Sequence, residues 1–178
     1  MKIKLSLLIL LVVGLSVQLS ANPINGLLER IDKGASKKFV IEFKKGADDF
    51  FELDQKGTKV VVRGNNYVNI ATGINWYLKY YAGIQLSWNG MQAKLPQALP
   101  PVPRKERHET SLSLRYDFNY CTYSYTMAFW DWERWEKEID WMALHGINLP
   151  LAAVGQECIW FNMLQKLGYS KDEINRFI

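Results

Sequence analysis

Asn119 and Cys121 are the first residues whose types and position could do chemistry. They come just after an alternating run at residues 111–116, which is typical of a strand. If that strand belongs to a (β/α) barrel, the loop that follows it faces the active site. An asparagine there could donate and accept hydrogen bonds to a ligand, or it could shape a turn. The pattern leaves both interpretations open.

Gln156 and Glu157 occupy the matching place after a second apolar run, at residues 147–152. Glu157 is the tempting catalytic acid or base, because loops at that end of a barrel carry catalytic groups. A glutamate in the first turn of a helix is equally favoured by the helix dipole. Gln156 could bond a ligand hydroxyl or cap backbone groups. Both remain candidates for lining a pocket.

Other kinds of site are not indicated. The two cysteines, Cys121 and Cys158, lack the spacing of a zinc site, and they could pair in an oxidising compartment only if the fold brings them close. Neither His108 nor His145 has a recognisable nucleophile or base nearby in the sequence. The sequence contains no Gly-rich phosphate loop and no Ser/His/Asp pattern. We therefore predict no metal and no cofactor.

The second half of the chain predicts alternating strands and helices. Asp131 is placed to cap a helix that runs to Gly146, between the two apolar runs, so strand, helix and strand form a βαβ unit of a parallel sheet. A further helix is expected at residues 157–167, followed by a third that Ser170 and Glu173 begin as a capping box. In the helix that Asp131 caps, we expect one apolar face to pack on the barrel. This face is made of Trp132, Trp135, Ile139 and Met142.

The first half predicts a small α/β domain over residues 22–94. Helices are expected at residues 24–31 and 65–82, around a small antiparallel sheet whose strands are residues 39–43, 50–53 and 58–63. A linker is expected at residues 95–109, which hold four of the six prolines and so should be extended and unpaired. The second domain then covers residues 110–178.

Residues 1–21 have the layout of a secretory signal peptide. Lys2 and Lys4 precede an apolar run, and small residues lead to Ala21. The run is too short to span a membrane, so we expect cleavage, no membrane span in the mature protein, and a secreted or periplasmic location. Without the two lysines, 20 basic and 18 acidic residues leave a charge of +2, from the +4 of the whole chain. That balance does not indicate nucleic-acid binding.

Four stretches of the second half carry a resemblance to a known family. Residues 115–125, 129–144, 146–149 and 155–160 closely resemble the opening of the catalytic domain of α-N-acetylglucosaminidases, glycoside hydrolase family 89. The string of tryptophans and acids in them is specific. The first domain resembles the family's N-terminal α/β domain in layout. The implied fold is a small N-terminal α/β domain followed by the first βα units of a truncated (β/α)8 TIM-type barrel.

The resemblance also implies a function. A protein of this family is a retaining exo-glycosidase that removes terminal α-linked N-acetylglucosamine, with two carboxyl groups roughly 5 Å apart. In the family both glutamates come from later barrel strands, so none of the catalytic residues is expected in this chain, which alone should be inactive. Asn119 and Cys121 match an element that lines the family's sugar pocket. The expected partner is therefore a glycan with terminal α-N-acetylglucosamine.

Two alternatives stay open at this stage. The first is a non-catalytic carbohydrate-binding or adhesion protein, in which the α/β domain and the aromatic loop at residues 119–130 bind glycans without cleaving them. The second is an exported glycosidase of the same fold with another sugar preference. Oligomeric state is not indicated by any pattern.

Overall fold

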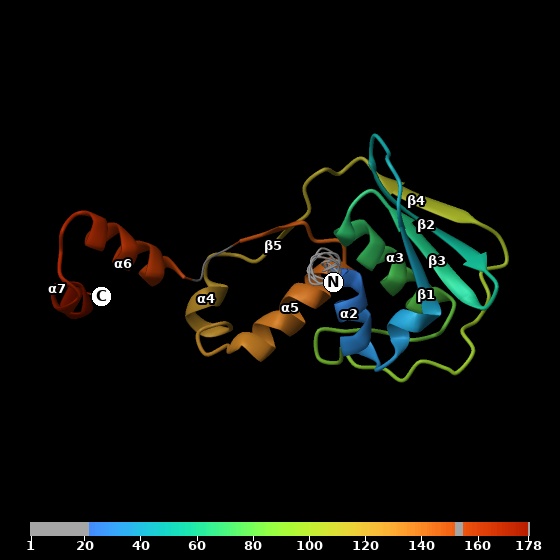
Figure 1. Cartoon of the computed structure of the whole chain (residues 1–178), viewed down its shortest axis with the longest axis horizontal. Coiled ribbons are helices and arrows are strands. Elements are labelled where there is room, and N and C mark those ends of the chain that lie inside the picture. Colours follow the sequence, from blue (N-terminus) through green and yellow to red (C-terminus); the bar gives the residue numbers. More distant parts are fainter. Residues whose placement is uncertain (1–21, 152–154, 178) are drawn as a thin grey trace, which may run out of the picture.

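The structure is a computed structural model that describes residues 22–151 and 155–177. The predicted signal peptide, residues 1–21, lies outside these residues, and so does the end of the second predicted strand. The first domain is built around a four-stranded sheet in the order β1-β3-β2-β4 (Figure 1). Its strands are β1 (Phe39–Phe43), β2 (Asp49–Lys56), β3 (Lys59–Gly64) and β4 (Glu106–Thr110).

The sheet is mixed rather than antiparallel as predicted. β2 and β3 form a hairpin whose turn contains Gly57 at φ +60°, and β4 pairs antiparallel with the other edge of β2. Both edges of β2 are therefore taken. β1 pairs instead with the free edge of β3, and it runs parallel to that strand. The prediction was wrong because it assumed that strands adjacent in sequence pair with one another.

The predicted linker ends in a strand. Residues 95–105 form no helix or strand, as expected of a linker, but β4 forms a ladder with β2 in which His108 lies opposite Phe51. Pro103 is the last proline of the stretch. From Arg104 to Thr110 every residue has an amide donor, so nothing prevents pairing. The first domain therefore includes β4 and reaches Thr110.

Two capped helices cover the sheet of the first domain. They are α2 (Pro23–Ile31) and α3 (Tyr67–Tyr80), with the short 3-10 helix η1 (Ala35–Lys38) after α2. Asn22 and Asn66 cap the two helices through their side-chain oxygens. α3 crosses β2 and β3 and contacts α2. The resulting core contains, among others, the fully buried side chains Leu28, Leu53, Val62, Ile70, Ile74, Tyr77 and Leu78.

The second domain begins with the predicted βαβ unit. Its elements are β5 (Tyr116–Asp117), α4 (Thr122–Tyr125), α5 (Trp132–Leu144) and β6 (Leu149–Pro150). β5 and β6 pair in parallel, with Tyr116 opposite Leu149, so the unit is confirmed. The two strands are shorter than the apolar runs suggested. Asp131 caps α5, since its carboxylate accepts a hydrogen bond from the Arg134 amide at 2.9 Å.

The buried face of α5 contains only part of the predicted one: Met142 is buried, at 5% exposed, but two of the other three residues are not. Trp132 and Ile139 are 69% and 48% exposed, whereas Glu138 and Leu144 are 1% and 0% exposed. α5 packs against α3 of the first domain. The acidic side is buried as well because Arg30 and Trp88 of the first domain bond its carboxylates, which an apolar pattern does not reveal.

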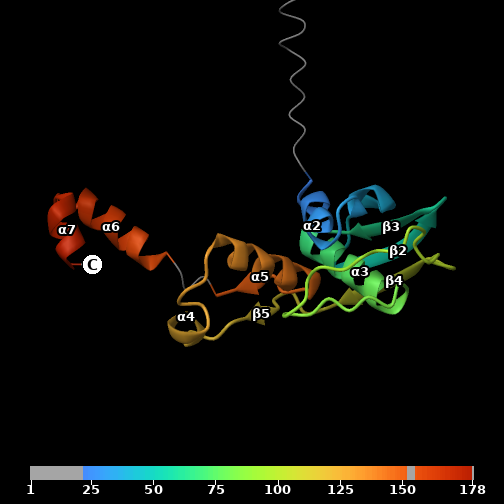
Figure 2. The same ribbon diagram turned by 90° about the horizontal axis from the view of Figure 1, so that it is seen from below.

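Two further helices, α6 (Gln156–Lys166) and α7 (Lys171–Phe177), lie apart from the rest of the chain (Figures 1 and 2). α6 has no buried residue, and Ile174 is the one buried residue among those described in α7. The predicted capping box is confirmed, because the Glu173 carboxylate accepts from the Ser170 amide at 2.9 Å and the Glu173 amide donates to the Ser170 hydroxyl at 3.3 Å. No helix within the described ranges combines the length and apolarity needed to cross a bilayer.

Candidate functional site

A backbone conformation that is rare for its residue type precedes Asn119. Phe118, directly after β5, has φ +74°, and among the described residues it is the one non-glycine residue with positive φ. Its amide donates to the Asp117 carboxylate at 2.7 Å. A bulky aromatic residue adopts this conformation at a cost, and such outliers cluster at ligand sites. The strained residue lies between β5 and the turn that carries Asn119.

Asn119 shapes the turn that follows. Its side-chain oxygen accepts hydrogen bonds from the amides of Cys121 and Thr122 at 2.8 and 3.2 Å, and its backbone carbonyl accepts from the Thr122 hydroxyl at 2.8 Å. The turn-forming interpretation therefore holds for the oxygen. The side chain is exposed, and its nitrogen donates to none of the described residues. That nitrogen is free to donate to a ligand.

Both cysteines carry free, exposed thiols. Cys121 lies in the turn, and Cys158 lies on α6, where its sulfur accepts from the Asn162 side chain at 3.5 Å. The pairing that the sequence left open is absent within the described chain. Cys121 is thus a small, uncharged side chain beside Asn119, without a histidine or other base bonded to it among the described residues.

Gln156 and Glu157 open α6 behind Gly155, which has φ +84°. Both side chains are exposed, and neither makes a hydrogen bond or ion pair with a described residue. Glu157 stands in the first turn of the helix, where the helix dipole favours a negative charge. The structure does not bring these two residues into contact with Asn119 or Cys121. Within residues 22–151 and 155–177, no cluster of three His, Cys, Asp or Glu side chains could hold a metal ion.

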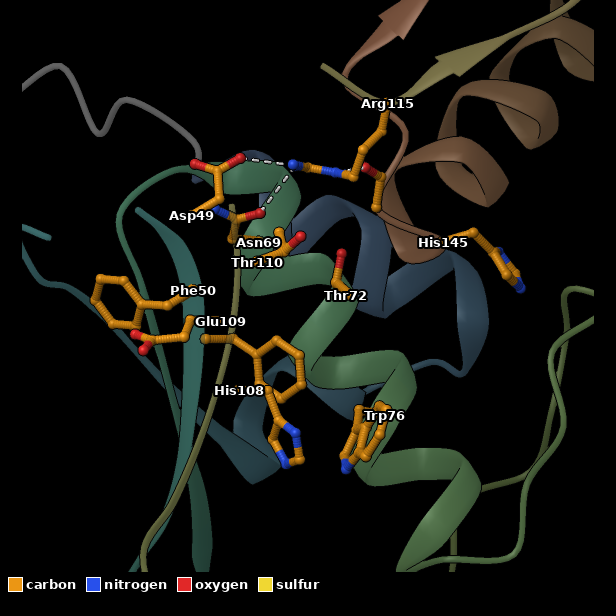
Figure 3. A pocket seen from close by; sticks show the side chains of 12 residues that line it. Asp49, Phe50, Asn69, Thr72, Trp76, His108, Glu109, Thr110, Arg115 and His145 are labelled. Carbon is orange, nitrogen blue, oxygen red and sulfur yellow. Dashed lines mark hydrogen bonds and ion pairs between the residues drawn. The ribbon is translucent and has the colours of Figure 1, made fainter. Parts of the chain in front are cut away.

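A cavity of about 220 Å³ lies where the two domains meet (Figure 3). Its apolar wall is aromatic: the ring of His108 stacks on Phe51 with centroids 4.9 Å apart and lies 4.3 Å from the ring of Trp76. Its polar wall joins β2 and α3 to the residue before β5, because Arg115 bonds the Asp49 carboxylate at 2.8 Å and the Asn69 side-chain oxygen at 3.2 Å.

The polar wall of this cavity is already paired. Burial raises the pKa of Asp49, but hydrogen bonds from Arg115 and Asn69 outweigh it and lower the pKa below its usual value. Asp49 therefore stays ionised and is unsuited to donate a proton. Its partners Arg115 and Asn69 are also hydrogen-bonded to each other. The cavity is a junction between the domains rather than a catalytic centre.

Arg115 is the residue that sequence reasoning missed. Besides Asp49 and Asn69, its guanidinium donates to the carbonyls of Gly146 and Leu112, the latter at 2.6 Å. Only an arginine has enough donors in fixed directions for such a set. The sequence signal was a charged residue inside the predicted strand at residues 111–116, but its partners are distant in sequence.

A second set of contacts fixes α5 to the first domain. The Glu138 carboxylate accepts from the indole of Trp88 and from Arg134, both at 2.7 Å. The Arg134 guanidinium also lies 3.9 Å from the ring centroid of Trp130. Trp88 and Trp130 thus serve packing, as most of the aromatic density of this region was expected to do. The loop that carries Asn119 is therefore anchored at both ends, at Arg115 before β5 and at Trp130 before α5.

Comparisons with known proteins bear on both domains. Residues 22–101 match the family model described as the α-N-acetylglucosaminidase N-terminal domain, and residues 115–178 match the one described as the α-N-acetylglucosaminidase TIM-barrel domain. Human α-N-acetylglucosaminidase is 42% identical over 146 residues, which are 82% of this chain and 20% of the relative.

Solved structures give the same picture. Family 89 glycoside hydrolases from Clostridium perfringens match with a TM-score of 0.79 and 39% identity, over 86% of this chain and 18% of theirs. One was solved with 2-acetamido-1,2-dideoxynojirimycin and another with its substrate GlcNAc-α-1,4-galactose. The chain thus spans about a fifth of the length of these relatives. The predicted fold, a small α/β domain followed by the start of a TIM barrel, is confirmed.

Proposed function

We propose, because this chain belongs to the α-N-acetylglucosaminidase family, glycoside hydrolase family 89, that the whole protein hydrolyses terminal α-linked N-acetylglucosamine from glycans. The observation that carries the proposal is the match of both family domains, in order, along the chain. Relatives that act on this sugar linkage support the substrate class.

In this proposal the chain supplies part of the sugar pocket and none of the reacting carboxylates. The free nitrogen of Asn119 donates to a sugar hydroxyl, and Cys121 forms a small wall beside it. Both follow β5, at the end of the strand where barrel enzymes build their sites. Gln156 and Glu157 follow β6 at the same end and line the outer part of the pocket.

The substrate assignment is tested on the full-length protein with aryl α-glycosides. Turnover of the α-N-acetylglucosaminide, with little turnover of the α-N-acetylgalactosaminide or the α-glucoside, is the expected result. Another sugar preference would favour a different glycosidase of the same fold. Binding of the glycan without turnover would favour the carbohydrate-binding alternative. The 178-residue chain alone serves as a control that should give no turnover.

The roles of the two pocket residues separate in variants of the full-length protein. Asn119→Ala should raise KM about fivefold, because one hydrogen bond to a ligand contributes about 1 kcal/mol. Cys121→Ser should change kcat/KM by less than about threefold, since a wall residue performs no chemistry. If Cys121→Ser abolished turnover, the thiol would have to act directly, and the assigned role would be wrong.

We further propose that the protein is exported, with residues 1–21 removed as a signal peptide. The layout of that segment supports export. Mass spectrometry of the protein recovered from the secreted or periplasmic fraction should give an N-terminus at Asn22. An uncleaved protein that stays in the cytoplasm would contradict the proposal.

A further inference from the structure

Arg115 connects the first domain to the turn that carries Asn119. It directly precedes β5, and Asn119 follows four residues later. We propose that Arg115 is a positioning residue through which the first domain sets the place of the sugar-binding turn. The inference rests on the proposed function, because the pocket role of Asn119 belongs to that function.

The side chain of Arg115 is held by the first domain. Its terminal nitrogen lies 2.8 Å from the Asp49 carboxylate on β2 and 3.2 Å from the Asn69 oxygen on α3. The side chains of Arg115 and Asp49 are only 16% and 17% exposed. Ion pairs this deeply placed are screened less than surface pairs, and breaking one leaves a buried charge without its partner. The link is therefore costly to lose.

The backbone of Arg115 is held by the second domain. Its amide donates to the Asn148 side-chain oxygen at 2.8 Å, and its carbonyl accepts from the amides of Asn148 and Leu149 at 3.1 Å. The same residue thus fixes the start of β5 against the start of β6. Figure 3 shows its side chain reaching from the second domain toward Asp49 and Asn69. Arg115 transmits the position of one domain to the first strand of the other.

The bend at Phe118 explains why that position matters for the sugar site. Only Tyr116 and Asp117 separate Arg115 from Phe118, so the chain has little length in which to absorb an error. A strained backbone persists only where its surroundings over-determine it. Without the anchor at Arg115, Phe118 is free to relax toward negative φ, and Asn119 moves with it. A displacement of about 1 Å at a binding group is enough to weaken a site markedly.

The test compares two variants of Arg115 with a variant of another contact between the domains. In the full-length protein, Arg115→Ala and Arg115→Lys should each raise KM for the aryl α-N-acetylglucosaminide about tenfold, with a smaller change in kcat. Lysine should fail to rescue, because a single ammonium lacks the fork that reaches both Asp49 and Asn69. Asp140→Asn, which weakens the ion pair that Asp140 on α5 forms with Arg30 on α2 at 2.6 Å, should lower stability and leave KM unchanged.

A structural measurement separates positioning from general destabilisation. Amide hydrogen exchange at residues 116–122 of the full-length protein should speed up in Arg115→Ala and not in Asp140→Asn. If Arg115→Ala lowers the melting temperature but changes neither KM nor this exchange, the residue is merely structural and the inference is wrong. If the wild-type protein shows no turnover, the proposed function fails, while the exchange result still decides whether Arg115 fixes the turn.

Discussion

Arg30 and Asp140 form a two-pronged ion pair across 110 residues of sequence, with Nε to Oδ2 at 2.6 Å and the terminal nitrogen to Oδ1 at 2.7 Å. The pair joins α2 of the first domain to α5 of the second. A guanidinium and a carboxylate match in this parallel arrangement, which is stronger than a single contact. The pair also explains why the acidic side of α5 faces inward, against the apolar pattern.

A double-mutant cycle on this pair should give a coupling free energy of about 1–2 kcal/mol. The value exceeds that of a surface pair because the Asp140 side chain is 12% exposed, although Arg30 remains 41% exposed and partly screened. Urea denaturation of the chain with Arg30→Ala, Asp140→Ala and both together measures it. The exposed pair Lys137–Glu133, at 2.8 Å, is the matched control and should couple by less than about 0.5 kcal/mol. Equal coupling in the two pairs would contradict the prediction.

Glu52 predicts a loss of stability in acid. Its side chain is 3% exposed and lies 2.7 Å from Lys44, 2.9 Å from Lys105 and 3.2 Å from Arg107. Burial raises the pKa of Glu52, but hydrogen bonds from Lys105, Lys44 and Arg107 outweigh burial and lower the pKa from 4.5 to about 2. Because the folded-state pKa is the lower one, the folded protein binds fewer protons. This stabilisation is present above pH 4.5 and is lost as the pH falls toward 2.

Glu52→Gln isolates that contribution. At pH 7 the variant should unfold with a free energy about 2 kcal/mol lower than the wild type, as expected for hydrogen bonds to a buried charge. The difference between the two proteins should shrink as the pH is lowered to about 3, where protonation of Glu52 begins to mimic the glutamine. Denaturation curves over this pH range measure it, with the exposed Glu133→Gln as the control. If the difference in unfolding free energy stayed constant with pH, the ionised carboxylate of Glu52 would not be its source.

Gly73 predicts a packing limit between α3 and the sheet. A Cβ added there would lie 2.9 Å from Val62 Cγ1 and 3.1 Å from Phe51 Cβ, both in the core. Gly73→Ala should therefore lower the free energy of unfolding by about 1–2 kcal/mol, even though alanine favours a helix. Gly26→Ala on α2 is the matched control, since the nearest atom is the flexible end of Arg30 at 3.3 Å. Thermal denaturation compares the two variants. If Gly73→Ala were more stable than the wild type, the core would accommodate the added methyl group and the prediction would be wrong.

Local signals predicted the longer helices, whereas α4 lies within residues 119–130, which were expected to form a loop. α2, α3 and α5 begin at Asn or Asp caps that are visible in the sequence, and each continues in a 3.6-residue apolar pattern. The pairing of β1 with β3 and the presence of β4 were not predictable in this way. They depend on which strand edges remain free once the hairpin of β2 and β3 has formed, and that competition leaves no mark in any single segment.

The candidate site was also predicted only in part, because local signals located its residues but not their contacts with residues distant in sequence. The position of Asn119 and Cys121 after a strand follows from local alternation, and the structure places both in one exposed turn. The left-handed φ of Phe118 could not be foreseen, because aromatic residues rarely adopt it and no glycine signals it. The role of Arg115 depends on Asp49 and Asn69, which a single sequence cannot pair with it.

The edge strand β4 determines where the first domain can be separated from the rest of the protein. Because β4 is made by residues that follow the proline-rich stretch, a segment ending among the prolines would lose one quarter of its sheet and leave the edge of β2 bare. Bare edges recruit strands from neighbouring molecules, which leads to aggregates. A well-behaved excised domain should therefore extend at least through Thr110.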